Sequence, residues 1–180
     1  MKSIIAAVVA FAAVPAFCHA ETVVFAVYGT VSEVNGGGNS LVMKASNGAK
    51  YTLHAAKATA VKGYDGAAAG AVGAFNGVKA GSEAVAHYTV SGAKLTAVSV
   101  HKVGGAGLTA TEGTVQAISE GTKTIALKTA DGSVHTYKLA ENATATASEA
   151  TAKGVTIGGK AVVYSTEAAG AKIAHFVRGI

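Results

Sequence analysis

The sequence predicts an all-β protein: two tandem small five-stranded barrels of the OB-like or SH3-like type, preceded by a signal peptide. Three observations support this fold class. The same series of segments occurs twice in the same order, Asn47-Gly48 and Asp131-Gly132 stand between alternating strand-like runs, and the first twenty residues have the layout of a secretory leader. Asn-Gly and Asp-Gly pairs are typical of a tight β-hairpin turn, because both residues tolerate positive φ.

Residues 1–20, "MKSIIAAVVAFAAVPAFCHA", are predicted to be a cleaved signal peptide. Lys2 supplies the positive start, an apolar stretch runs to Phe17, and "CHA" places small residues before a cleavage site. The apolar stretch is shorter than the roughly 20 residues that a membrane span needs, and no second such run follows. We therefore expect a soluble periplasmic or secreted protein. The alternative is lipidation of Cys18, but that modification requires a small residue where Phe17 stands.

The remainder of the chain is interpreted as an internal duplication. The matching segments keep their order, and the gaps between them fall at predicted turns, where insertions are tolerated. The predicted units are residues 21–103 and 113–180, joined by a glycine-rich linker at 104–112. The matches are "GTVSEV" (29–34) with "GTVQAI" (113–118), "LVMKASNGAKYTL" (41–53) with "IALKTADGSVHTYKL" (125–139, two residues longer), "GSEAVAHYT" (81–89) with "GGKAVVYST" (158–166), and "GAKLTAVSV" (92–100) with "GAKIAHFV" (170–177).

Each copy contains five expected strands, and closing them into a barrel removes exposed sheet edges. The connection "ENATATASEATAKG" (141–154) is expected to contain a short helix despite its threonines, and "GYDGAAAGAVGAFNG" (63–77) is expected to be irregular. The strands are predicted at 23–34, 41–46, 50–55, 84–90 and 95–102, and at 114–119, 124–130, 134–140, 160–166 and 172–178.

Each unit is small enough for its hydrophobic core to be marginal, and alanine supplies many of the apolar residues. Alanine buries little area, and burial contributes about 25 cal/mol per Å². We therefore expect either that the two copies pack on each other or that the protein forms a homo-oligomer.

The search for chemistry identifies no catalytic group and no cofactor site. No two acidic residues suggest the paired carboxylates of acid–base catalysis, no serine stands in a G-x-S-x-G setting, and cleavage removes the single cysteine. The histidines form no H-x-H or H-x-x-x-H pair, so no metal site with enough ligands can be named. If the first late hairpin turns at 91–93, His101 faces Glu83 and His87 faces Ala97, and the same construction puts Tyr164 opposite His175.

Five residues are candidates for surface binding: Tyr51, Tyr137, His87, His101 and His175. Tyr51 and Tyr137 are aligned with each other, and a recurring aromatic residue can be a stacking platform for bases or sugars. It can equally be a core residue that the fold demands. The low aromatic content of 6% and the absence of tryptophan favour the core.

The formal charge of +5 and the pI near 9.3 leave three function classes open. The first is a non-catalytic adaptor or structural module that recognises a protein or polymer of the cell envelope. The second is a binder of polyanions, such as nucleic acid, lipopolysaccharide or acidic polysaccharide. Isolated lysines are more typical of solvated strand faces than of a nucleic-acid footprint. The third is a metal-binding or hydrolytic enzyme.

The segments "EGTVQAISEGTKTIALKTADGSVHTYKL", "FNGVKAGSEAVAHYT" and "KAVVYSTEAAGAKIAHF" resemble a group of exported bacterial tandem-repeat proteins. Each unit is also similar to domains of unknown function that have a Gly-Thr-Val opening strand, an Asp-Gly hairpin and a late Gly-x-x-Val strand. Those domains are thought to be small OB-like barrels. The resemblance covers nearly all of residues 21–180 and implies this fold and export, but it implies no catalytic or ligand-binding residue.

Overall fold

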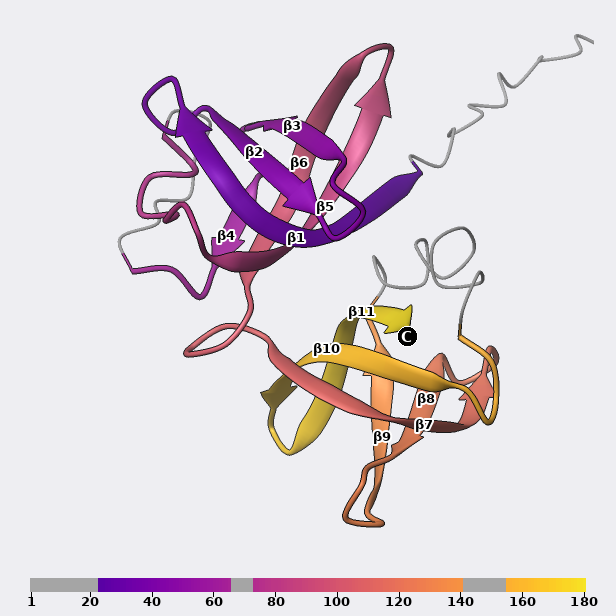
Figure 1. The fold of residues 1–180 in the computed structure, drawn as a ribbon. Helices are drawn as coiled ribbons and strands as arrows, with labels where there is room; N and C mark the ends of the chain where they lie inside the picture. Colours follow the sequence, from indigo (N-terminus) through magenta and orange to yellow (C-terminus); the bar gives the residue numbers. More distant parts are fainter. Residues whose placement is uncertain (1–22, 66–72, 141–154) are drawn as a thin grey trace, which may run out of the picture.

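The computed structural model describes residues 23–65, 73–140 and 155–180, which form eleven β-strands in two units (Figure 1). No helix occurs in these ranges, and the helix expected at 141–154 lies outside them, as does the predicted signal peptide. The strands of the first unit are β1 (Val24–Asn35), β2 (Ser40–Ala45), β3 (Lys50–His54), β4 (Ala60–Lys62), β5 (Glu83–Ser91) and β6 (Lys94–Lys102). Those of the second unit are β7 (Thr109–Ser119), β8 (Thr124–Lys128), β9 (Val134–Leu139), β10 (Lys160–Ala168) and β11 (Ala171–Gly179).

Both units are five-stranded OB-like barrels, as the sequence predicts. The second closes in the order β7-β8-β9-β11-β10, and the first has the same order, β1-β2-β3-β6-β5. In each barrel the third and fifth strands pair in parallel, and the other neighbours are antiparallel. The short strand β4, which the sequence did not predict, adds to β6 in parallel. Closure leaves few free edges for unwanted pairing.

The glycine of the repeated "GTV" segment lies against the backbone of the second strand in both barrels. Gly29 and Gly113 each lie where an added Cβ would collide with a backbone oxygen, that of Lys44 in the first barrel and that of Lys128 in the second. Only a residue without a side chain fits there, so the first strand can bend across the second.

The strand registers correct part of the sequence alignment. Leu41 pairs with Leu53 in the first barrel, and Ile125 pairs with Tyr137 in the second. A constant shift of 84 residues therefore relates the first three strands of the two barrels, and no two-residue insertion exists. Tyr137 corresponds to Leu53 rather than to Tyr51. A shift of 77 residues relates the last two strands, since Tyr88 pairs with Ala97 and Ser165 with Ala174.

The two barrels pack on each other through a third hydrophobic cluster, besides the core inside each barrel. Leu108, which lies in the predicted linker, is 1% exposed within this cluster. Strand β7 begins at Thr109, so the last four residues of that predicted linker belong to the second barrel. Of the two arrangements expected from the marginal cores, the structure shows contact between the copies. The buried members of the cluster are Val85, Leu108, Val162, Tyr164 and Phe176.

Candidate functional site: two lysine-bearing faces and the joint between the barrels

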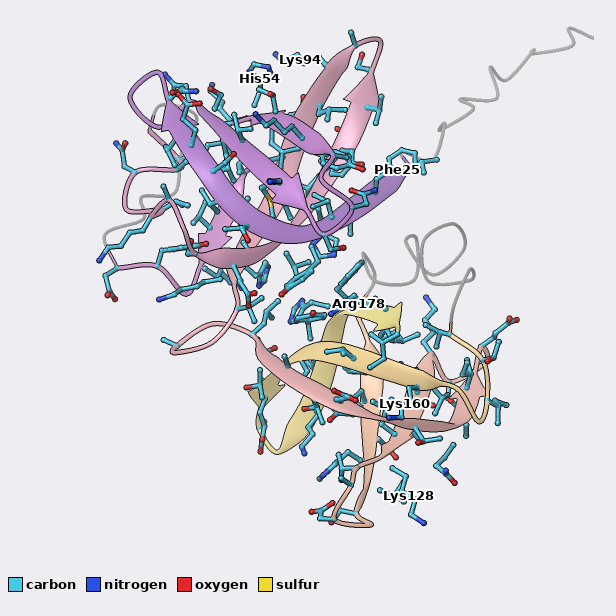
Figure 2. The ribbon with its side chains drawn as sticks, viewed as in Figure 1. Phe25, His54, Lys94, Lys128, Lys160 and Arg178 are labelled. Atoms are coloured by element: carbon cyan, nitrogen blue, oxygen red, sulfur yellow. The ribbon has the colours of Figure 1, made fainter. Side chains whose placement is uncertain are left out.

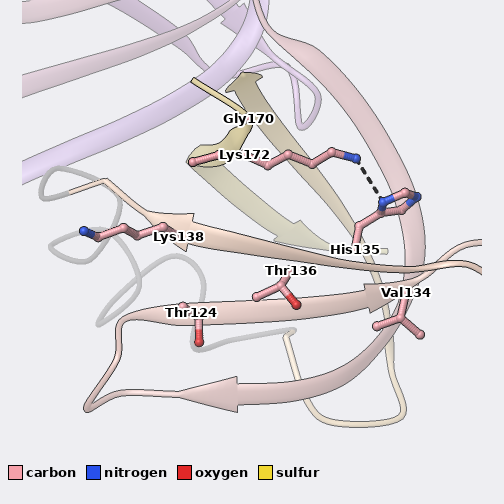
Figure 3. Close-up of a pocket in the computed structure, with 8 residues that line it drawn as sticks. Thr124, Val134, His135, Thr136, Lys138, Gly170 and Lys172 are labelled. Atoms are coloured by element: carbon pink, nitrogen blue, oxygen red, sulfur yellow. Dashed lines mark hydrogen bonds between the residues drawn. The ribbon is translucent and has the colours of Figure 1, made fainter. Parts of the chain in front are cut away.

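A surface cavity of about 320 Å³ lies on the second barrel, between β8, β9 and the β10–β11 turn (Figure 3). Alternation along β9 buries Tyr137 and turns Thr136 and Lys138 outward. The turn brings Lys172 to the same cavity. None of the eight lining residues carries a carboxylate. They are Thr124, Val134, His135, Thr136, Lys138, Gly170, Ala171 and Lys172.

A lysine–histidine contact holds one wall of this cavity. The Lys172 Nζ lies 2.9 Å from His135 Nδ1, as the dashed line in Figure 3 shows. A lysine ammonium can only donate, so His135 accepts at Nδ1 in its neutral form. Lys138 is exposed, and its ammonium group is accessible to an anion. Figure 3 shows the Lys138 ammonium directed away from Lys172 and His135, so the two cations lie at opposite ends of the lining, which also includes a histidine and the hydroxyls of Thr124 and Thr136.

The first barrel carries cations on the corresponding face. The register places Lys50 and His54 on β3, where the second barrel has Val134 and Lys138. Lys94 begins β6 at the adjacent turn, and β3 pairs with β6 two residues further on, where His54 faces Thr96. Figure 2 shows His54 and Lys94 at the same end of this barrel. Both repeats thus place lysine and histidine over the third strand and the last hairpin turn.

The second notable region is the joint, the contact between the β5–β6 hairpin and the β10–β11 hairpin. The rings of Tyr28 and Tyr164 lie 4.8 Å apart. The Arg178 guanidinium sits 5.3 Å from the centre of the Tyr28 ring, and its Nε donates to the Tyr164 hydroxyl at 3.2 Å. Burial, with a smaller contribution from a hydrogen bond to Glu83, raises the pKa of Tyr28.

Three of the predicted candidates, His87, His101 and His175, meet at this joint. His87 Nε2 lies 3.0 Å from the backbone oxygen of His175, and its Nδ1 lies 3.1 Å from Ser99 Oγ. Because a carbonyl only accepts, Nε2 carries the proton and Nδ1 accepts from the serine hydroxyl. The rings of His101 and His175 are 4.8 Å apart, and His175 Nε2 lies 2.9 Å from Thr166 Oγ1.

The joint favours neutral histidines. Burial lowers the pKa of His87 to about 4, an effect that the hydrogen bond to His175 only partly offsets. Burial, and then the charges of His175, His87 and Lys62, lower the pKa of His101 to about 3. The pKa of His175 is also lowered, first by burial and then by Lys62. These side chains therefore act as uncharged hydrogen-bonding and stacking groups at neutral pH.

The predicted histidine pairs are wrong, because the position of the turn and a β-bulge both shift the register. His101 pairs with Val85 rather than with Glu83, and His87 pairs with Ser99 rather than with Ala97. The first late hairpin turns at residues 92–93, since Ser91 pairs with Lys94, and this moves the register by one residue. Each late hairpin also contains one extra residue, which shifts the register by one more beyond it. In the second barrel that extra residue is His175, so Tyr164 pairs with Phe176.

The two tyrosines predicted as alternative stacking platforms pack inward. Tyr137 is 1% exposed within the second core. Tyr51 is partly buried against the first core, and its ring centre lies 6.0 Å from that of Tyr88. Sequence reasoning missed Lys94, Lys138 and Lys172, which it interpreted as isolated solvated charges. Lys94 and Lys172 each follow a predicted hairpin turn, which was the signal that could have identified them, whereas Lys138 near the end of β9 carries no such signal.

The described residues contain no group of three or more His, Cys, Asp and Glu side chains arranged to hold a metal ion. Across 23–65, 73–140 and 155–180, no helix has the length and apolar character needed to cross a bilayer.

No family model matches the sequence, and no curated protein is significantly similar to it. Among solved structures, one described as "drosophila Unr CSD456" aligns with 86% of this chain, at 9% identity and a TM-score of 0.34. The alignment spans 61% of that longer chain. A likeness at this level carries no functional weight, and the site is defined by the geometry described above.

Proposed function

We propose that the protein is an exported, non-catalytic binding module whose ligand is an anionic polymer, with acidic carbohydrate favoured over nucleic acid. The observation that carries this proposal is the cavity formed by β8, β9 and the β10–β11 turn, lined by Lys138, Lys172 and His135. OB-type barrels bind oligonucleotides and oligosaccharides on the face of their second and third strands, beside the turn between the fourth and fifth strands.

The duplication supports an extended ligand. Each barrel has cations on the corresponding face, and the joint connects the two barrels through a buried apolar cluster. A polymer that reaches both faces makes its second contact within one complex, which raises avidity without any new kind of contact. In this proposal the envelope partner expected from the sequence is a polymer rather than a protein.

The side chains on these faces favour carbohydrate. Single-stranded nucleic acids are bound largely by stacking of bases on exposed aromatic rings. Tyr51 and Tyr137 are turned toward the cores, and no aromatic residue other than His135 lines the described cavity. Lysine ammonium groups and threonine hydroxyls suit the carboxylates, sulfates and hydroxyls of an acidic sugar chain.

The test measures binding of fluorescently labelled heparin, polygalacturonate and single-stranded DNA from 25 to 200 mM salt. The variant Lys94→Gln/Lys138→Gln removes one ammonium from each face, and Lys57→Gln/Lys79→Gln is the charge-matched control on exposed loops. We expect the face variant to lose at least about tenfold in affinity, since one charge-assisted hydrogen bond is worth about 1.5–3 kcal/mol. The control should bind like the unmodified protein.

Two results would contradict the proposal, and a third would change the class of its ligand. Equal losses in both double variants would mean that only net charge matters. Affinity for every polymer that does not change with salt would exclude an electrostatic site. Tighter binding of the DNA than of either polysaccharide would redirect the proposal to nucleic acid.

A further inference from the structure

One end of the first barrel is closed by large apolar side chains. Phe25 on β1 and Tyr88 on β5 are cross-strand partners, and their rings stack with centres 5.8 Å apart. Val27 and Leu53 are buried beside them, and Leu95 packs against the same cluster. Together these five residues fill the space between the strands at this end.

The same end of the second barrel is hollow. The registers place Thr109 where the first barrel has Phe25, and Ser165 where it has Tyr88, and these two are again cross-strand partners. Thr111 replaces Val27, and Lys172 replaces Leu95. The result is a cavity of about 100 Å³ lined by Thr109, Thr111, Tyr137, Ser165, Thr166, Glu167 and Lys172.

This cavity is larger and more polar than packing alone requires. A single buried water needs about 10–15 Å³ of such space, so several small groups fit. Ser165 is 5% exposed, and Tyr137 is 1% exposed with a hydroxyl that has no hydrogen-bond partner in the described part of the chain. A buried hydroxyl without a partner is costly, and bound water or ligand commonly satisfies such a group.

We propose that this cavity binds one sugar residue, the end of the anionic polymer that the lysine-bearing faces hold. This inference rests on the proposed function for the identity of the polymer, and on the cavity itself for the sugar. A sugar hydroxyl both donates and accepts, and the cavity offers an acceptor in Glu167, a donor in Lys172 and the aliphatic hydroxyls of Thr109, Thr111 and Ser165, which do both. The fourth lining hydroxyl, that of Thr166, is hydrogen-bonded to His175.

Other classes of ligand fit these groups less well. A simple anion would lie against the Glu167 carboxylate, and a simple cation would lie against the Lys172 ammonium. An apolar ligand would leave the lining hydroxyls without hydrogen bonds, at a cost for each buried group. A neutral or mildly acidic polyhydroxylated ring satisfies both charges and the hydroxyls together.

Lys172 connects this cavity with the proposed polymer face. It lines both cavities, its Nζ bonds to His135 on the face side, and the same Nζ lies 5.8 Å from the centre of the Tyr137 ring. A chain bound along β9 can therefore direct its terminal ring past Lys172 into the hollow end. The first barrel has Leu95 and a filled interior at this point, so we expect one terminal-sugar site per chain.

The experiment titrates the full mature chain with D-glucuronate, D-glucose and glycine, followed by amide chemical shifts. We expect saturable binding of the sugars with a dissociation constant on the order of 1 mM, as for a ligand with few heavy atoms. The affected amides should be those of Thr109, Thr111, Ser165 and Glu167. Glycine is the zwitterionic control and should cause no saturable shift.

Two cavity variants and one face variant make the assignment specific. Glu167→Gln removes the negative charge and replaces one accepting oxygen with a donating NH2 group, so it should weaken sugar binding at least fivefold. Thr109→Phe restores the residue of the first barrel and should abolish it. Thermal unfolding shows whether each variant is folded, and Glu167→Gln on the exposed end of β10 keeps the test informative if Thr109→Phe is not. Lys138→Gln should weaken polymer binding and leave the sugar affinity unchanged.

The outcomes separate the two proposals. If the polymer binds but the sugars do not, or if glycine binds as well as they do, the terminal-sugar site is refuted and the proposed function stands. If the sugars bind and the polymers do not, the cavity assignment stands and the proposed function falls. Sugar affinity that is unchanged in Glu167→Gln would place the sugar elsewhere and overturn the inference.

Discussion

The two barrels have the same arrangement of strands and differ in the side chains at one end of the barrel. Both keep the strand order, the bulge in the first strand and the bulge in the last hairpin. At the compared end, Phe25 and Tyr88 stack in the first barrel, and Thr109 and Ser165 border a cavity in the second. Backbone hydrogen bonds and close glycine contacts set the shape of the barrel, so side chains at its end can change without loss of the fold.

The joint between the barrels shows a second kind of divergence. Equivalent hairpins meet there in the manner of a self-complementary interface between two copies of one chain. The first barrel contributes His87 and His101, and the second contributes Tyr164 and Arg178 at the equivalent positions. The two barrels therefore present different side chains at equivalent positions of the joint.

The largest expected effect on stability comes from placing serine, the residue of the second barrel, at position 88 of the first barrel. Tyr88→Ser removes a ring that contacts Phe25 and Tyr51, and truncation of a large buried aromatic side chain costs about 3–5 kcal/mol. Urea unfolding of the full chain should show this loss. The control at the equivalent position, Ser165→Ala, changes the wall of an existing cavity and should cost less than about 1 kcal/mol. Equal losses would mean that the two ends are packed alike.

Acid should lower the free energy of unfolding by weakening the joint, and this effect should be somewhat smaller than that of Tyr88→Ser. The pKa of His87 is about 4 in the folded chain, against an ordinary value near 6.5, so the unfolded chain binds more protons between these values and stability falls as pH falls. The loss is absent above pH 6.5 and reaches about 3 kcal/mol for His87 once the pH drops below 4. Urea unfolding at pH 7 and pH 4 measures it.

The charges that face the histidines act in the same direction. Lys62 of the first barrel lies near His101 and His175 and opposes their protonation. A joint held by neutral histidines is therefore expected to open before either barrel unfolds, which would appear as two transitions at pH 4 where one is seen at pH 7. His135→Gln, away from the joint, is the control and should leave this pH dependence unchanged. A free energy of unfolding that is constant from pH 7 to 4 would contradict the neutral joint.

The sequence predicted the fold well because each strand is bounded by local turn chemistry. Nine of the eleven strands were predicted to within two residues, β7 begins five residues before its predicted start, and hairpins such as that at Asp131-Gly132 fix their own register. Strand β4 was missed since three residues, Ala60 to Lys62, carry no detectable alternation. The late hairpins were predicted one or two residues out of register, because a bulge such as that at His175 leaves no pattern in the sequence.

The candidate site was less predictable, because it depends on which residues become neighbours across strands. Lys138 and Lys172 are far apart in the sequence and line the same cavity only because β9 and β11 pair in parallel. The three joint histidines were singled out individually, but their meeting depends on packing between barrels. The replacement of Phe25 by Thr109 and of Tyr88 by Ser165 follows from the repeat alignment, but only the cross-strand pairings show that these positions adjoin and border a cavity.

The smallest expected effect compares the two Gly-containing hairpin turns. Asn47 Oδ1 accepts from the amide of Ala49 in the first, whereas Asp131 accepts from the amide and hydroxyl of Ser133 and from the Thr129 hydroxyl in the second. These hydrogen bonds, led by that of Thr129, lower the pKa of Asp131 to about 2.

The carboxylate therefore supports its hairpin fully above its ordinary pKa near 4, and this support fades as pH falls through about 2. An NMR titration should show the Ser133 amide losing exchange protection over that interval, while the Ala49 amide, bonded to a side chain that does not titrate, keeps its protection relative to its neighbours. Asp131→Asn should make the second turn behave like the first. If both amides respond equally to acid, the difference between the turns does not depend on the charge.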